Sequence, residues 1–86
     1  MYNIEIAPSA LKFLEKLTKS NKNISNRLNA AIDNLKTSPY IGKKLTSELK
    51  DCRSLRVGDY RIIYSIIEHQ ILIQIIKIGH RREIYR

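Results

Sequence analysis

The sequence contains one cysteine, Cys52, among its 86 residues, so an internal disulfide is impossible. Such sparing use of cysteine fits a reducing compartment. The apolar runs are far too short to span a bilayer, and residues 1–6 alternate polar and apolar side chains rather than forming the apolar core of a signal peptide. We therefore expect a cytoplasmic protein with no membrane partner.

Acidic residues are also scarce. Eight Asp and Glu face sixteen Lys and Arg, which gives a net charge of +8 and a pI near 9.9. This excess favours a polyanionic partner such as nucleic acid or an acidic protein, although a basic protein without such a partner is the alternative. Lysines dominate the first half of the chain and arginines the second. Because arginine binds phosphate in a bidentate manner, we expect a phosphate-binding face in the second half.

Several familiar catalytic patterns are missing. The two histidines, His69 and His80, have no acidic or thiol neighbours at metal-ligand spacing, and there is no glycine-rich phosphate loop and no serine nucleophile motif. The carboxylates in the arginine-rich half are not paired. We therefore expect neither a metal nor a cofactor, and any chemistry must rely on arginine, tyrosine, histidine and lysine.

Hydrophobic periodicity predicts the secondary structure. Alternation in residues 2–6 predicts a strand, and apolar residues at helical spacing predict one helix from Pro8 and a second from Ile24 to about Ser38, where Pro39 disfavours helix. A loop at 39–50 then precedes three strands, and these are predicted at 52–57, 60–67 and 71–78, followed by a short extended segment at 83–85. The order βααβββ predicts a single α+β domain over residues 1–86, in which an antiparallel helix hairpin covers one face of a mostly antiparallel, twisted sheet.

Paired isoleucines interrupt the alternation expected of a sheet with one wet face. They occur at 62–63, 66–67 and 75–76, and they place apolar side chains on both faces. Either the central strands are covered on both sides by the chain itself, or a protein partner covers the second face.

The stretch 55–64 carries the clearest functional signal. Arg56 and Arg61 flank a Gly58-Asp59 turn between two apolar runs, so a hairpin would direct both arginines at one anion. A second cluster follows the third strand, and it contains His80, Arg81, Arg82 and Tyr85. Such a set suits RNA cleavage by the 2′-hydroxyl, in which arginines stabilise the phosphate charge and Tyr85 or His80 carries a proton. Tyr85 also suits stacking on an unpaired base. Composition alone does not separate this enzyme from a basic binding module.

The motif Leu-Arg-Val-Gly-Asp-Tyr-Arg-Ile-Ile-Tyr at 55–64, followed by Ile-Gly-His-Arg-Arg-Glu-Ile-Tyr at 78–85, resembles the RelE/ParE superfamily of toxins from type II toxin–antitoxin systems. The resemblance covers nearly the whole chain and implies a RelE-like fold. In the RelE branch it implies a metal-independent mRNA interferase that cleaves the message in the ribosomal A site. It also implies a cognate antitoxin of the RelB type, besides the ribosome and mRNA as partners.

By this resemblance, Arg61 and Arg81 would act on the phosphate or leaving group, Tyr85 would position the nucleotide, and Arg56 would contact RNA. Members with a defined mechanism carry a lysine pair on the strand before the turn, whereas this chain has Cys-Arg-Ser-Leu at 52–55. Substitutes for the missing lysines, and further RNA contacts, are expected among Lys44, Lys50, Arg53, His80 and Arg82. Two rival functions stay open, namely a ParE-like inhibitor of DNA gyrase that is not an enzyme and a non-catalytic module that binds RNA or the ribosome.

Overall fold

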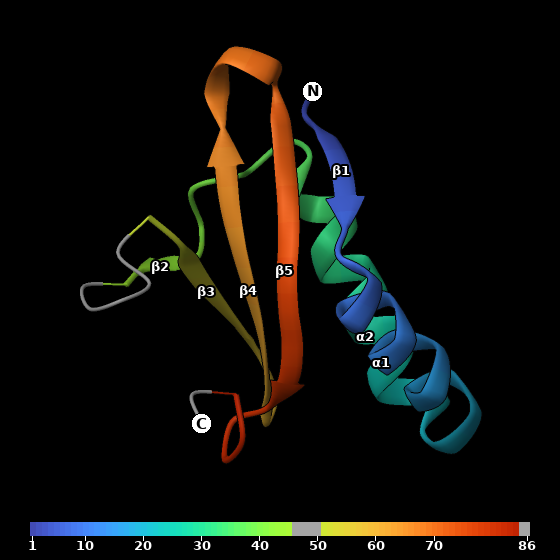
Figure 1. Cartoon of the computed structure of the whole chain (residues 1–86). Helices are drawn as coiled ribbons and strands as arrows, with labels where there is room; N and C mark the ends of the chain where they lie inside the picture. Colours follow the sequence, from blue (N-terminus) through green and yellow to red (C-terminus); the bar gives the residue numbers. More distant parts are fainter. Residues whose placement is uncertain (46–50, 85–86) are drawn as a thin grey trace.

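The computed structural model describes residues 1–45 and 51–84 of the chain. Within these residues, two helices and a five-stranded sheet confirm the expected α+β class (Figure 1). The elements are β1 (Asn3–Ile6), α1 (Pro8–Ser20), α2 (Lys22–Leu35), β2 (Lys43–Lys44), β3 (Arg53–Val57), β4 (Tyr60–Ile67), the 3-10 turn η1 (Glu68–Gln70) and β5 (Leu72–His80). Neither described helix is long and apolar enough to cross a membrane.

The two helices form the predicted hairpin, with only Asn21 between them. The Asn21 backbone N–H donates to Leu17 O at 2.7 Å and closes α1, while its side-chain Oδ1 accepts from the Ile24 N–H at 3.3 Å and caps α2. Asparagine is among the preferred N-cap residues because its side chain satisfies a free N–H of the first turn. One residue therefore ends the first helix and begins the second.

Helix α2 ends at Leu35, three residues earlier than predicted. The chain continues as a tight turn in which the N–H groups of Lys36 and Thr37 donate to the carbonyl groups of Asp33 and Asn34. Such i→i+3 bonds are common where a helix tightens at its end.

The strand order in the sheet is β1-β5-β4-β3-β2. Strand β1 runs parallel to β5, and the other pairs are antiparallel, as expected of a mostly antiparallel sheet. Strand β2 lies inside the predicted loop 39–50 and was missed, because two residues are too few to show an alternating pattern.

The predicted extended segment at 83–85 is wrong for its first two residues. The N–H groups of Glu83 and Ile84 both donate to His80 O, so the chain turns back immediately after β5. Strand β5 also reaches His80 rather than ending at Ile78. Tyr85 lies outside the described residues.

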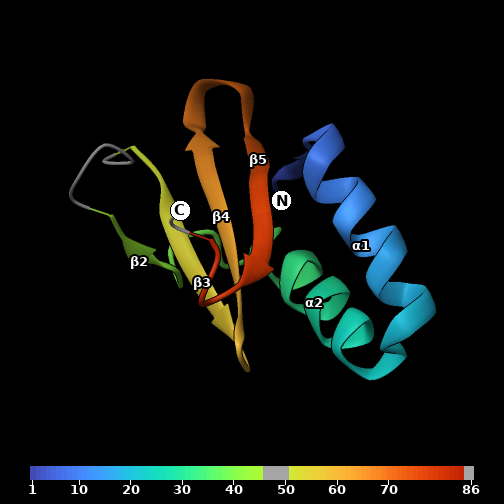
Figure 2. The same cartoon turned by 60° about the horizontal axis from the view of Figure 1, so that its bottom comes forward.

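The two faces of the sheet differ sharply. On the helix-side face, α1 and α2 bury strand residues that include Ile62, Tyr64 and Ile73, each 0% exposed. On the opposite face, which we call the open face, the turn after β5 folds back over the sheet on the side away from both helices (Figure 2). Ile84 in that turn is 3% exposed and packs against Gly79.

At 62–63 the paired isoleucines are explained by the chain itself, which covers both faces of the sheet there. Ile62 belongs to the helix-side core, whereas Ile63 points to the open face and is still buried at 2% exposure. At 75–76 the cause differs, because a β-bulge in the pairing of β4 with β5 leaves Ile76 at 37% exposure.

Candidate functional site

Arg56 and Arg61 are direct cross-strand partners in the β3–β4 hairpin. Side chains of directly opposed residues lie on the same face, with Cβ atoms about 4.5–5.5 Å apart. Their neighbours in sequence, Leu55, Val57 and Ile62, pack into the helix-side core, so both arginines belong to the open face. The sequence prediction that these two residues converge is confirmed by this register.

The turn that joins the two strands requires glycine. Gly58 has φ +60°, and it is followed by Asp59, whose φ is not positive. A positive φ at the first of two central residues is the pattern of a type II′ hairpin turn, in which glycine occupies that position. The Arg56 Nε donates to Gly58 O at 3.2 Å, so the turn also fixes one of the arginines.

The C-terminal turn is tied to the same hairpin tip. The Arg81 N–H donates to Asp59 O at 2.8 Å, and Arg81 Nε lies 3.9 Å from Asp59 Oδ1. A Cβ built on Gly79 would lie 3.2 Å from Ile84 Cδ1, so the absence of a side chain at Gly79 makes room for Ile84 on the open face. Gly79 is the β5 partner of Arg61, which brings the C-terminal turn next to that arginine.

The Arg61 guanidinium makes no hydrogen bond or ion pair with any residue in the described ranges, and Arg56 has only its bond to the turn. Two cations held opposite each other without a carboxylate repel each other, which costs stability unless an anion binds between them. This arrangement is typical of a site that is completed by a phosphate.

Two lysines that sequence reasoning did not single out share the open face. Lys43 pairs with Ser54, and Lys77 pairs with Ile63. The register thus aligns Lys43, Ser54, Ile63 and Lys77 across four strands, one row away from the arginine pair. The bulge in β5 hid the face of Lys77, because simple alternation from Ile73 and Ile75 would place Lys77 in the core. Lys43 was hidden by the missed strand β2.

Three predicted site residues lie on the helix-side face instead. Arg53 pairs with Tyr64, and its Nη1 donates to Gly42 O at 2.8 Å and to Tyr40 O at 3.2 Å. Lys44 pairs with Arg53 on the same face. His80 pairs with Tyr60, and the two rings are 5.5 Å apart in an edge-on arrangement.

The remaining predicted residues belong to the C-terminal turn or lie outside the described ranges. Arg82 is exposed, and its backbone N–H donates to His80 Nδ1 at 3.2 Å. Lys50 and Tyr85 lie outside the described residues. The structure therefore brings Arg56, Arg61 and Arg81 together around one hairpin tip, and it places Arg53, Lys44 and His80 apart from them.

A buried tyrosine fixes the segment before β2. The Tyr64 hydroxyl donates to Pro39 O at 2.7 Å and accepts from the Gly42 N–H at 2.9 Å. Gly42 is needed there, because a Cβ would lie 2.5 Å from the hydroxyl oxygen. Burial raises the pKa of Tyr64, so the hydroxyl keeps its proton for the bond to Pro39 O.

Three described side chains, Tyr40, Cys52 and Tyr64, have a raised pKa. Burial raises the pKa of the Cys52 thiol, which makes it a poor nucleophile at neutral pH. The pKa of Tyr40 is also raised, first by its hydrogen bond to Glu68. Among the described residues, no group of three His, Cys, Asp or Glu side chains has the arrangement of a metal site.

Comparison with known proteins agrees with this fold. Residues 4–85 match the family model described as the ParE toxin of the type II toxin–antitoxin system parDE. Toxin RelG of Mycobacterium tuberculosis is 30% identical over 86 residues, which cover 99% of this chain and 97% of that protein. The chain therefore belongs to the RelE/ParE superfamily of toxins from type II toxin–antitoxin systems.

Solved structures support the same relationship. The toxin–antitoxin complex RelBE2 from Mycobacterium tuberculosis contains a chain that aligns with a TM-score of 0.82 and 28% identity, over 93% of this chain and 98% of that one. The intact RelBE complex from Escherichia coli aligns with a TM-score of 0.78 and 22% identity, over 93% and 96% of the two chains, and this likeness concerns the fold.

Proposed function

We propose that this toxin is an mRNA interferase that cuts messages in the ribosomal A site and thereby inhibits translation. The observation that carries the proposal is the cross-strand pair Arg56–Arg61 on the open face, with Arg81 tethered to the same hairpin tip. Relatives named RelE and RelG support an interferase within the superfamily. Action on ribosomes would place the protein in the cytoplasm.

The chemistry we assign is attack of the RNA 2′-hydroxyl on the adjacent phosphate, with no metal. The developing negative charge on the phosphate is stabilised by Arg61, which lies on the open face opposite Arg56, and by Arg81, which is tethered to Asp59 at the same hairpin tip. Arg56 and the exposed Lys43 and Lys77 extend the cationic surface along the flanking phosphates. We also assign Tyr85, which follows Ile84 in the sequence, the positioning of the nucleotide.

We further propose an antitoxin that neutralises this surface. The aligned RelBE2 and RelBE structures are complexes of a toxin with its antitoxin. In this chain the partner would supply the carboxylates that Arg56 and Arg61 lack, and an apolar contact for the exposed Ile76.

Primer extension on messages from a translating extract tests the proposal. Added wild-type protein should generate new 5′ ends within codons positioned in the A site. Messages that stay whole in a translating extract would overturn the interferase assignment.

Gyrase inhibition is the second candidate, and the match to the ParE family model favours it. Strand β3 also lacks lysine, which leaves the proton-accepting side of the interferase chemistry without its usual residue. Trapped complexes of gyrase with DNA, together with intact messages, would identify this function.

A further inference from the structure

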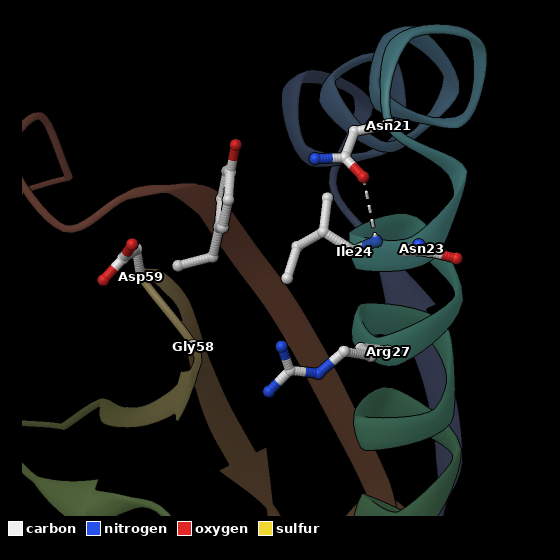
Figure 3. A pocket seen from close by; sticks show the side chains of 7 residues that line it. Asn21, Asn23, Ile24, Arg27, Gly58 and Asp59 are labelled. Atoms are coloured by element: carbon white, nitrogen blue, oxygen red, sulfur yellow. Dashed lines mark hydrogen bonds between the residues drawn. The ribbon is translucent and has the colours of Figure 1, made fainter.

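A pocket of about 340 Å³ lies behind the hairpin tip, between the start of α2 and the β3–β4 turn (Figure 3). Arg27 extends from α2 toward Gly58, Asn21 lies above it in this view, and the Asn23 side chain lies beside Ile24 and extends away from the turn. Tyr60 completes the lining on the strand side. The volume falls in the range of small-molecule sites and suits a single nucleotide better than a folded element.

The polar groups in this pocket are free to bind a ligand. Within the described residues, no hydrogen bond or ion pair engages the Arg27 guanidinium, the Asn23 side chain or the Tyr60 hydroxyl. By contrast, Asn21 Oδ1 already caps α2, so the helix end is not the anion ligand here. Arg27 is the cation that an anionic group entering the pocket would meet.

The pocket and the arginine pair lie on opposite sides of the same turn. Arg27 Nη1 lies 3.3 Å from the position of a Cβ on Gly58, while Arg56 Nε donates to the carbonyl of the same glycine. Two arginines from different elements, α2 and β3, thus flank the bare backbone of Gly58. A larger residue at this position would widen the gap between them, besides straining the positive φ.

The one carboxylate that lines the pocket is turned away from Arg27. Figure 3 shows the Asp59 side chain on the opposite side of the pocket, directed away from the guanidinium. The Asp59 carboxylate instead forms an ion pair with Arg81, in which Arg81 Nε lies 3.9 Å from Asp59 Oδ1. An anion beside Arg27 therefore does not have to displace an existing ion pair.

We propose that this pocket binds a nucleotide of single-stranded RNA that flanks the cleavage site. The phosphate of that nucleotide contacts Arg27, its base and ribose lie against the Tyr60 side chain, and the strand continues around Gly58 to Arg56 and Arg61. Aromatic groups beside a cationic track are the usual means of binding unpaired nucleotides. The inference rests on the RNA substrate of the proposed function and adds a second subsite to it.

Fluorescence anisotropy with labelled oligouridylates tests this subsite on the intact toxin without ribosomes. The probes are a dinucleotide, which reaches only the arginine pair, and an oligomer of about eight nucleotides, which is long enough to reach the pocket. Arg27→Ala should weaken binding of the longer probe about fivefold, as loss of an exposed phosphate contact does, and should leave the dinucleotide unaffected. Arg27→Lys should retain most of the affinity. Lys12→Ala is the matched control, because Lys12 is an exposed cation on α1 away from the pocket.

A salt titration distinguishes a phosphate contact from a change in structure. Loss of one phosphate contact lowers the slope of log affinity against log salt by about 0.7 for a single strand. An equal loss for both probes, an unchanged slope, or wild-type protein that binds neither probe would each overturn the subsite. So would Arg27→Ala weakening a polyglutamate probe and not RNA, because the pocket would then serve an acidic protein.

Cleavage assays keep this inference separate from the proposed function. Wild-type toxin that cuts messages, with Arg27→Ala binding both probes normally, would leave the interferase intact and remove the subsite. Wild-type toxin that cuts nothing, with RNA binding that depends on Arg27, would leave the subsite intact and remove the interferase.

Discussion

The two faces of the sheet are built from the same strands but differ in composition, since one is apolar and buried and the other carries exposed cations. The helix-side face buries a continuous apolar core under α1 and α2, whereas the open face carries Arg56, Arg61 and Lys77 and is contacted by the C-terminal turn. The core that stabilises the fold is thus on one side, and the proposed cleavage site is on the other. Because adjacent residues of a strand belong to opposite faces, substitutions one position apart should separate the two properties.

The largest expected effect on stability is at Ile62. Ile62→Ala should lower the free energy of unfolding by about 2–5 kcal/mol, because Ile62 is fully buried under the helices and the cavity cannot close. Ile84→Ala should cost less, because the C-terminal turn can open locally while the core stays folded. Urea unfolding followed by circular dichroism measures both.

The loss of cleavage rate in these two variants should follow the opposite order to their loss of stability. Folded Ile62→Ala protein should keep its cleavage rate, whereas Ile84→Ala should lose about tenfold through misplacement of Arg81, with Ile84→Val restoring most of it. If Ile84→Ala left the cleavage rate unchanged, the contact of Ile84 with Gly79 would not be what positions Arg81.

The largest expected effect on activity is at Arg61. Arg61→Ala and Arg81→Ala should each lower the single-turnover cleavage rate on programmed ribosomes by about 10²-fold, because each removes a preorganised charge from the phosphate. Arg61→Ala should at the same time leave stability unchanged or slightly higher, because it relieves the repulsion from Arg56. Wild-type rates in both variants would contradict the assignment, and Lys12→Ala is the control for charge.

A smaller effect is expected at Tyr64, the residue that ties the core to the segment before β2. Tyr64→Phe should cost about 1–3 kcal/mol at neutral pH, because the buried Pro39 carbonyl and Gly42 N–H lose their partner. Burial raises the pKa of Tyr64 above its value of about 10 in the unfolded chain. Its contribution is therefore complete below pH 10 and is lost as the pH rises through the folded-state pKa.

Unfolding curves from neutral to alkaline pH check this sign. The difference in the free energy of unfolding between wild type and Tyr64→Phe should shrink above pH 10, because all other titratable groups are common to both proteins and their effects cancel. A gap that widens above pH 10 would mean that the folded protein binds the ionised form of Tyr64.

Most of the fold was accessible from the sequence because its signals are local. Helical spacing located both helices, and the Gly58-Asp59 turn fixed the register that pairs Arg56 with Arg61. The features that could not be predicted from the sequence depend on pairing between strands that are distant in the chain. The bulge that turns Lys77 to the open face and the short strand that orients Lys43 arise from contacts with β4 and β3. His80 was expected beside the arginines, but the extension of β5 by two residues places it with Tyr60 on the helix side.

The smallest expected effect is on ribosome binding by variants of the adjacent residues Lys43 and Lys44, and it distinguishes which face of the sheet the RNA follows. The register places Lys43 on the open face opposite Ser54 and Lys44 on the helix-side face opposite Arg53. If RNA follows the open face, Lys43→Ala should weaken toxin binding to programmed ribosomes by about threefold, the usual effect of one exposed charge, and Lys44→Ala should weaken it less. Both variants remove the same charge from the same edge strand, so a general electrostatic effect would make them equal. Equal losses would mean that the substrate is attracted by the net charge of the chain, and a larger loss for Lys44→Ala would move the RNA path to the face that carries Arg53.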